Sequence, residues 1–128
     1  MADVLNKKML IIEDEDPLAQ IVQDEFLGAG FSVSRGRDGE EGLRMALEGH
    51  PDIILLDIII PKFDGFEVLK RLRDDSWGKS VKVILLTNLG LDEKMTKAIT
   101  MYKPSAYIVK TDMQLEELIQ KTKEVLGI

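Results

Sequence analysis

The 128-residue sequence has no cysteine and only one histidine. The lack of cysteine excludes a disulfide framework and a zinc site built on cysteine. No apolar run approaches the roughly 20 residues that a membrane span needs. Residues 1–8 also lack the apolar core of a signal peptide. We therefore expect a cytoplasmic protein with no membrane partner.

Repeats, low-complexity segments and linkers rich in proline or glycine are also missing. We therefore expect residues 1–128 to form a single domain, with no output domain in this chain. The net charge of −6 argues against non-specific binding to nucleic acid, so we expect no direct nucleic-acid partner. The apolar fraction of 45% and the charged fraction of 31% are typical of a globular protein with its own core.

Strand and helix patterns alternate five times along the chain. Short apolar or alternating runs predict strands at residues 9–12, 31–34, 53–56, 81–86 and 106–109. Helical spacing follows each strand. We expect Asp16, Asp38 and Thr111 to cap the first, second and last helices, with Gln114 completing a capping box with Thr111, and we expect the third and fourth helices near Phe66 and Met95. Such alternation predicts an α/β fold with a doubly wound parallel sheet, because each crossover is right-handed. The most apolar strands, 53–56 and 81–86, belong in the middle, and the alternating strand at 31–34 belongs at an edge.

The stretch around Asp57 combines a buried strand with a charged end. Four apolar residues, 53–56, run directly into Asp57, and Pro61 and then Asp64-Gly65 follow. A continuous apolar run suits a strand that is buried on both faces. Asp57 would then lie at the carboxyl end of that strand, where open α/β sheets place their ligand sites. A buried carboxylate needs a cation, a hydrogen-bond donor or water. Whether Asp57 belongs to a functional site therefore depends on which side chains lie at the other strand ends.

Other polar side chains also fall at strand ends. Glu13 and Asp14 follow the first strand, Thr87 ends the fourth and Lys110 ends the fifth. The carboxyl ends of parallel strands share one rim, so we expect these side chains to lie near Asp57. Two carboxylates about 4 Å apart repel by roughly 4 kcal/mol at an effective dielectric of about 20, so three of them need a cation or a shared proton. Oxygen ligands without histidine or cysteine favour Mg²⁺ over Zn²⁺.

Thr87 and Lys110 are not expected to ligate a metal ion, but both can bind phosphate oxygens, Lys110 as a mobile positive charge. An aspartate beside a hard metal ion, with such donors opposite, can accept a phosphoryl group. The residues themselves therefore allow an aspartate of this cluster, beside a Mg²⁺ ion, to accept a phosphoryl group.

These motifs resemble the receiver domain of two-component response regulators over essentially the whole chain. The acidic pair of that family corresponds to Glu13-Asp14, and its phosphoacceptor motif corresponds to Asp57 with Pro61 and Asp64-Gly65. The resemblance implies a flavodoxin-like, three-layer fold with five helices and a five-stranded parallel sheet of order 2-1-3-4-5. The pattern of strands and helices alone does not fix this order.

The resemblance also implies roles for the later strand ends. Thr87 corresponds to the switch hydroxyl of the family, Tyr107 to its aromatic partner and Lys110 to its lysine. Asp57 would take a phosphoryl group from a sensor histidine kinase or a histidine phosphotransfer protein, with Lys110 and Thr87 on the phosphoryl oxygens. Thr87 would move toward the phosphate and Tyr107 would turn inward, which reshapes the face made by the fourth helix, fifth strand and fifth helix. That face would bind a downstream protein or a second copy, and the chain would catalyse only its own phosphorylation and dephosphorylation.

A Mg²⁺ site with four contributors follows from the same resemblance. Asp14, Asp57 and the backbone carbonyl of Ile59 would bind the ion, and Glu13 would hold a metal-bound water. Glu13 stands where the family most often has aspartate, so that water would be held by a longer side chain.

In the same family, the positions of Ile59 and Leu89 border the path of the water that hydrolyses the aspartyl phosphate. Neither side chain can form a hydrogen bond, so neither can orient that water. We expect slow self-dephosphorylation and an output that outlasts the stimulus. The alternative is that both side chains only cover the rim.

Two other functions remain open from the sequence. A phosphatase of the haloacid dehalogenase type also uses a strand-end aspartate with Mg²⁺, but it carries Asp-x-Asp at its first strand, whereas the second residue after Asp57 is Ile59. A pseudo-receiver would act only as a binding module that is not phosphorylated. Such a module would lack an acid or the lysine, and neither is missing here.

Overall fold

A computed structural model of the chain describes residues 6–88 and 92–128. Within these residues the strands are β1 (Lys8–Ile12), β2 (Ser32–Gly36), β3 (Ile53–Asp57), β4 (Lys82–Thr87) and β5 (Ala106–Val109). The helices are α1 (Asp16–Gly28), α2 (Gly39–Gly49), α3 (Gly65–Asp74), α4 (Glu93–Tyr102) and α5 (Leu115–Leu126), and a 3₁₀ turn, η1 (Lys110–Asp112), precedes α5. All strand pairs are parallel, and the strand order is β2-β1-β3-β4-β5. The expected α/β fold is confirmed, with β2 at an edge and β3 in the centre.

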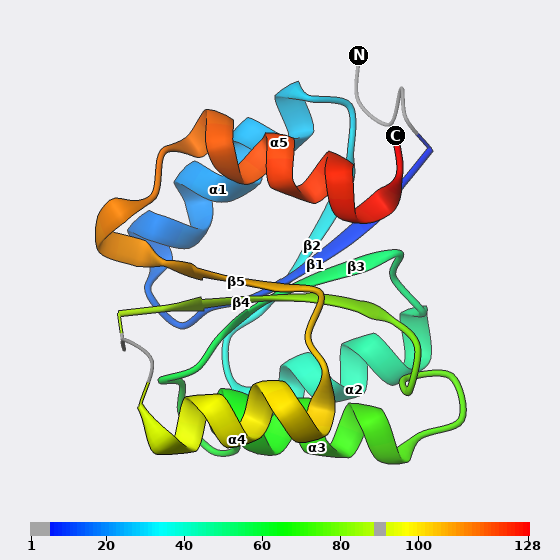
Figure 1. Cartoon of the computed structure of the whole chain (residues 1–128). Helices are drawn as coiled ribbons and strands as arrows, with labels where there is room; N and C mark the ends of the chain where they lie inside the picture. Colours follow the sequence, from blue (N-terminus) through cyan, green and yellow to red (C-terminus); the bar gives the residue numbers. More distant parts are fainter. Residues whose placement is uncertain (1–5, 89–91) are drawn as a thin grey trace.

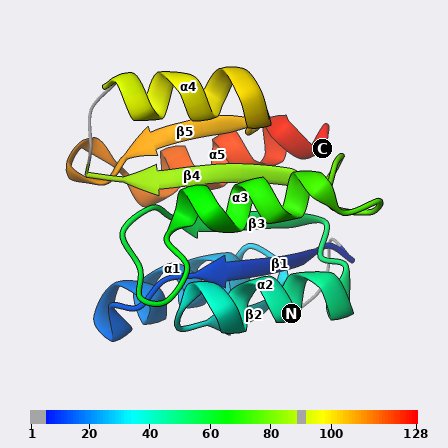
Figure 2. The same cartoon turned by 90° about the horizontal axis from the view of Figure 1, so that it is seen from below.

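The sheet is the middle of three layers. Helices α1 and α5 cover one face, and α2, α3 and α4 cover the other (Figure 1). The view in Figure 2 looks onto the second group, with α2, α3 and α4 in front of the strands. No helix in the described part of the chain is long and apolar enough to cross a bilayer.

The three interior strands, β1, β3 and β4, carry apolar side chains on both faces because both faces of the sheet are covered by helices. Every residue of β3 is buried. Alternate residues face opposite layers: Ile54 and Leu56 join the core under α2, α3 and α4, whereas Ile53 and Leu55 join the core under α1 and α5. This packing explains the uninterrupted apolar run, and it leaves Asp57 as the first polar side chain, at the carboxyl end of β3.

The expected helix caps are partly right. Asp38 caps α2, since its carboxylate accepts a hydrogen bond from the Glu41 amide at 2.8 Å. The predicted cap of α1 is wrong by one residue: Glu15 is the N-cap, and Asp16 is already helical. The physical reason is that the Asp16 carboxylate binds Arg35 at 2.6 Å and so does not cap the helix.

The predicted start of the last helix is also wrong. Lys110 to Asp112 form the 3₁₀ turn η1, closed by the Met113 amide on the Lys110 carbonyl at 3.2 Å. Because this turn occupies the residues after β5, α5 begins only at Leu115. Its N-cap is Gln114, whose side chain forms no capping hydrogen bond. Thr111 therefore caps no helix, and the predicted capping box is absent.

Candidate functional site

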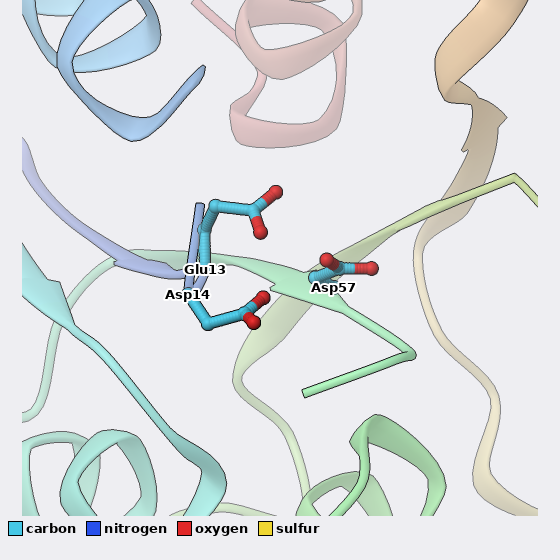
Figure 3. A group of neighbouring side chains, drawn as sticks. All are labelled: Glu13, Asp14 and Asp57. Carbon is cyan, nitrogen blue, oxygen red and sulfur yellow. The ribbon is translucent and has the colours of Figure 1, made fainter. Parts of the chain in front are cut away.

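Three carboxylates meet at the carboxyl ends of β1 and β3. Glu13 and Asp14 directly follow β1, and Asp57 is the last residue of β3. One carboxylate oxygen from each lies within 4.8 Å of those from the other two. Figure 3 shows the three side chains close together at the strand ends, with Glu13 and Asp14 extending in different directions from the end of β1. The parallel sheet thus brings together residues that are 44 positions apart in sequence, because neighbouring strands β1 and β3 end side by side.

Lys110 joins this cluster from the end of β5. Its Nζ lies 2.6 Å from Glu13 Oε1 and 2.8 Å from Asp57 Oδ2. The side chains of Lys110, Glu13 and Asp57 are only 9%, 3% and 6% exposed, so the interactions are largely shielded from water. Asp14, in contrast, is exposed. The site therefore has a buried interior, formed by two acids and a lysine, and one carboxylate facing solvent.

Burial and charge act in opposite directions on the titrating groups here. Burial raises the pKa of Glu13, and the neighbouring Asp57 raises it further, although the hydrogen bond from Lys110 opposes the shift. Burial disfavours the charge of Lys110, but its hydrogen bonds to Asp57 and Glu13 outweigh this effect and raise the pKa of Lys110. Lys110 therefore stays protonated and partly offsets the repulsion between the two buried acids.

The donor set fits a hard divalent cation. All three carboxylates supply oxygen, and the exposed Asp14 gives an ion access from solvent. Glu13 and Asp57 also share Lys110, so an ion at this cluster would have to share or replace the ammonium group as their positive partner. The residues present can thus hold Mg²⁺. The predicted roles of each ligand, including the carbonyl of Ile59, stay predictions.

The turn after β3 explains why this motif needs glycine. The amide of Gly65 donates to the Ile58 carbonyl at 2.8 Å, which draws the start of α3 against the end of β3. A Cβ at position 65 would lie 2.5 Å from the Asp57 carbonyl oxygen, so no larger residue fits without moving the backbone. Asp64 caps α3 through the Glu67 amide at 2.9 Å. The Asp64-Gly65 pair therefore fixes the backbone position from which the Asp57 carboxylate extends.

The remaining predicted residues lie in different surroundings. Ile59 donates its amide to Asp57 Oδ1 at 3.3 Å, and its side chain is exposed, with 62% of the residue open to solvent. Thr87, at the end of β4, is fully buried. Tyr107 on β5 is partly buried and packs against the core under α2, α3 and α4. Leu89 lies outside the described residues.

Arg35 is a residue of this site that the sequence interpretation missed. It lies near the end of β2, and its Nε and Nη2 donate to the Glu13 carbonyl at 3.0 and 2.8 Å. Its Nη1 donates to Asp16 at 2.6 Å, and this hydrogen bond lowers the pKa of Asp16. The side chain is only 10% exposed. Arg35 thus connects the edge strand to the loop that carries Glu13 and Asp14. Its position at the carboxyl end of a strand was the signal that could have found it.

We predict that Arg35→Ala weakens Mg²⁺ binding by about tenfold, because residues that orient metal ligands typically contribute factors of this size. The free energy of unfolding should fall by about 1–3 kcal/mol, since a carbonyl and a carboxylate lose charged donors. The matched control is Arg37→Ala, because Arg37 is exposed and lies 3.7 Å from Asp16 without contacting Glu13. Mg²⁺ titrations and denaturant unfolding of both variants measure these effects. Equal Mg²⁺ affinities in the two variants would contradict the role of Arg35.

Comparison with known families agrees with this geometry. Residues 9–123 match the response regulator receiver domain. The alkaline phosphatase synthesis transcriptional regulatory protein PhoP of Bacillus subtilis is 32% identical over 133 residues, an alignment that covers 94% of this chain and 54% of that protein. The polar-differentiation response regulator DivK of Brucella ovis is 34% identical over 125 residues and covers 96% of this chain and 98% of that protein. The chain thus spans about half the length of PhoP and nearly all of DivK.

The fold has the same relatives. The chemotaxis response regulator CheY4 of Vibrio cholerae superposes with a TM-score of 0.84 at 28% identity, over 93% of this chain and 98% of that one. Its similarity agrees with the strand order β2-β1-β3-β4-β5 and the five helices described above. The family match covers residues 9–123, and the acidic cluster lies at the carboxyl ends of β1 and β3 within that range. The chain therefore belongs to the response regulator receiver domain family and is a signalling module of two-component systems.

Proposed function

We propose that Asp57 accepts a phosphoryl group from the phosphohistidine of a sensor histidine kinase or a histidine phosphotransfer protein. The observation that carries this proposal is the position of Lys110, whose ammonium group lies 2.8 Å from the carboxylate of Asp57 in a shielded site. An oxygen of Asp57 attacks phosphorus in line, and a P–O bond forms as the P–N bond breaks. The electron pair of that bond stays on the ring nitrogen, and a proton already carried by the other ring nitrogen of the phosphohistidine lets the imidazole leave as a neutral side chain.

Lys110 and Thr87 hold the transferred group in this proposal. The ammonium of Lys110 is close enough to move from the carboxylate oxygen of Asp57 to a phosphoryl oxygen, where its charge opposes the charge that develops during transfer. Thr87 ends β4, the strand next to β3, and its hydroxyl would donate to another phosphoryl oxygen. When bound, Mg²⁺ would neutralise phosphoryl oxygens from the side of Asp14 and Asp57. The chain thereby promotes only its own phosphorylation and dephosphorylation and turns over no separate substrate.

Movement of Thr87 toward the phosphoryl group is the proposed start of the signal. Tyr107 lies on β5, the strand next to β4. Its side chain is only partly buried, so it would have room to turn inward. Its movement would change the face formed by α4, β5 and α5. We propose that this face binds a downstream protein target or a second copy of the chain. The expected cytoplasmic location belongs to the same proposal, because the phosphoryl donors are kinases that use ATP.

Incubation with a small phosphodonor, such as phosphoramidate, tests the proposed function. With Mg²⁺ present, the intact mass should increase by one phosphoryl group, and peptide mapping should place it on Asp57. Catalytic release of phosphate from added substrates would instead indicate a phosphatase of the haloacid dehalogenase type. An unchanged mass, with Mg²⁺ and a donor that labels another receiver domain, would indicate a pseudo-receiver.

We predict that Mg²⁺ raises the melting temperature. Binding at 100 times the Kd contributes about 2.7 kcal/mol by mass action, which corresponds to roughly 8 °C for a domain of this size. The physical reason is relief of the repulsion among Glu13, Asp14 and Asp57. Thermal unfolding with and without Mg²⁺ measures the shift. Asp14→Asn should lose most of it, whereas Asp24→Asn, on an exposed turn of α1, should retain it. If the melting temperature of the wild type does not change with Mg²⁺ in the millimolar range, the acidic cluster does not bind the ion.

We also predict slow self-dephosphorylation, which a variant with Ile59→Asn and Leu89→Glu should accelerate several-fold. The side chain of Ile59 is exposed beside Asp57 and offers no hydrogen bond to an attacking water. Phosphate loss is followed with Mg²⁺ present. Ile21→Asn is the control, because Ile21 is also an exposed isoleucine but lies on α1. If the double variant decays no faster than wild type, the two side chains only cover the rim.

A further inference from the structure

A groove between α3 and α4 lies outside the phosphoryl site. Its volume is about 540 Å³, and none of the residues that line it belongs to the acidic cluster or to Lys110. The two helices lie side by side on the same face of the sheet, as Figure 2 shows. The groove is on the side of α4 that faces α3, so it is also distinct from the face formed by α4, β5 and α5.

Contacts join the two helices at both ends, and the stronger ones are at the carboxyl ends. At their amino ends, Lys94 of α4 lies 3.7 Å from the carboxylate of Asp64, which caps α3. At their carboxyl ends, Arg73 of α3 donates to the carbonyls of Tyr102 and Lys103 at 2.7 and 3.1 Å. The groove is thus already formed, and a ligand would not have to pay for separating the helices.

The lining of the groove is partly apolar: Phe66 and Ala98 form its buried floor, Phe63 and Tyr102 are partly exposed, and Met101 is exposed. Its apolar side chains are Phe63, Phe66, Ala98, Met101 and Tyr102. On α4, positions 98, 101 and 102 have the spacing of one helix face, which here faces α3. Met101 is 54% exposed, although it is a large apolar residue. An unbranched methionine adapts its shape to an apolar partner, so this position suits a contact that forms on binding.

The charge of the groove is opposite to that of the whole chain. The lining contains two carboxylates and five cationic side chains, Lys62, Lys70, Arg71, Lys94 and Lys97, whereas the net charge of the chain is −6. Both carboxylates are already paired, Asp64 with Lys94 and Glu67 with Arg71 at 2.9 Å. Lys70 and Lys97 form no ion pair among the residues that the structure describes. One lysine therefore remains available on each wall.

We propose that this groove binds an acidic amphipathic helix of a partner protein. The exposed Met101 and the partly exposed Tyr102 would meet its apolar face, because Arg71 and Lys94 already lie over the rings of Phe63 and Phe66. Lys70 and Lys97 would meet acidic side chains on either flank. The wall from Lys94 to Met101 is about 11 Å long, which matches two turns of a bound helix. A membrane surface or nucleic acid would extend beyond the groove and meet the negative charge of the rest of the chain. Binding here does not require phosphorylation, so its test is independent of the proposed phosphoryl transfer.

A designed peptide provides the probe. It has about 16 residues, so that it can form a helix, with leucine at the i, i+3, i+4 and i+7 positions and glutamate on both flanks. Titration into the ¹⁵N-labelled chain should shift amide resonances of α3 and α4 and leave those of β5 and α5 in place. Two comparison peptides have lysine in place of glutamate, or the same composition with leucine spread around the helix. Both should bind at least tenfold more weakly, and the affinity of the acidic peptide should fall with added salt.

Charge reversal on the chain tests the same site from the other side. The variant with Lys70→Glu and Lys97→Glu should weaken binding of the acidic peptide about tenfold or more, and Met101→Ala should weaken it several-fold. The matched control has Lys79→Glu and Lys103→Glu, which makes the same change in charge at exposed lysines outside the groove. The control should stay within about twofold of wild type. All four changed lysines are exposed, and thermal unfolding checks that each variant is folded.

Three results would overturn the proposal. The first is equal affinity for the acidic and basic peptides, or for the regular and redistributed ones. The second is equal weakening by the groove variant and its control, or resonance shifts confined to α4, β5 and α5. The third is concentration-dependent shifts in α3 and α4 without peptide, together with dimers in analytical ultracentrifugation. That result would make a second copy of the chain the occupant.

Discussion

Replacing Asp57 with asparagine should abolish phosphorylation by a small phosphodonor and by a histidine kinase. An amide oxygen is a far poorer nucleophile than a carboxylate oxygen, and the variant also loses a negative charge from the expected Mg²⁺ site. No other acid in the cluster has the same position: Asp14 is exposed, and Glu13 directs its Oε1 to Lys110 at 2.6 Å. Intact mass after incubation should therefore show no added phosphoryl group.

The fold should survive this change. Asparagine keeps the oxygen that accepts the Ile59 amide, and Lys110 keeps Glu13 as its partner. We expect the free energy of unfolding to fall by less than the roughly 1.5–3 kcal/mol that a hydrogen bond to a charged group usually contributes, because loss of one carboxylate charge also relieves repulsion within the cluster. Asp64→Asn is the matched control: it makes the same substitution in the same loop, and asparagine also caps helices. Labelling of the Asp57 variant at the wild-type level, on another acid, would contradict the assignment.

Much of the site could be predicted because its chemistry lies at the ends of regular strands. The apolar run of β3 is continuous since both faces of the sheet are covered, and that pattern located Asp57 at a strand end. The parallel arrangement then implied that Glu13, Asp14 and Lys110 would lie nearby, as the structure places them. The strand order came from the resemblance to receiver domains, because alternation of strands and helices is compatible with several orders.

The remaining details depend on contacts between distant residues, which local patterns do not encode. Arg35 binds the carbonyl of Glu13; its position after the second strand places it at the correct edge of the sheet, but the local pattern does not specify this contact across 22 positions. The same side chain binds Asp16, which explains why the predicted helix cap was wrong. The local sequence predicts Thr111 as the N-cap of the last helix, but Thr111 lies within the 3₁₀ turn η1, which precedes α5. Local capping patterns fail where a tertiary hydrogen bond or a short turn uses the same residue.

Replacing Lys110 with methionine should have the second large effect, on both stability and phosphorylation. Methionine keeps most of the apolar stem but leaves Glu13 and Asp57 buried without their cation. Removing one partner from a buried ion pair typically reduces stability by 3–5 kcal/mol, and we expect about 3 kcal/mol because Glu13 can take up a proton. Phosphorylation should slow by at least about 100-fold, since the transferred group loses its positive partner.

The pH dependence distinguishes this explanation from a simple packing defect. Burial already raises the pKa of Glu13, and loss of Lys110 removes a hydrogen bond that lowers it. A carboxyl group whose pKa is raised by folding destabilises the protein above that pKa, and the penalty disappears as pH falls below the pKa of the unfolded chain. The stability difference between wild type and the Lys110 variant should therefore shrink as the pH falls through the raised pKa of Glu13 and below its ordinary value of 4.5. A packing defect would be nearly independent of pH.

Mg²⁺ should stabilise the Lys110→Met variant more than it stabilises wild type, because the ion no longer competes with an ammonium group for Glu13 and Asp57. Denaturant unfolding at several pH values, with and without Mg²⁺, measures both the loss of stability and the gain from the ion. Lys94→Met is the control, since that lysine is exposed and its ion pair with Asp64 at 3.7 Å should contribute less than about 1 kcal/mol. If the Lys110 variant has the same stability gain from Mg²⁺ as wild type, the lysine and the ion do not share these carboxylates. If its stability loss is constant with pH, unpaired charge is not the cause.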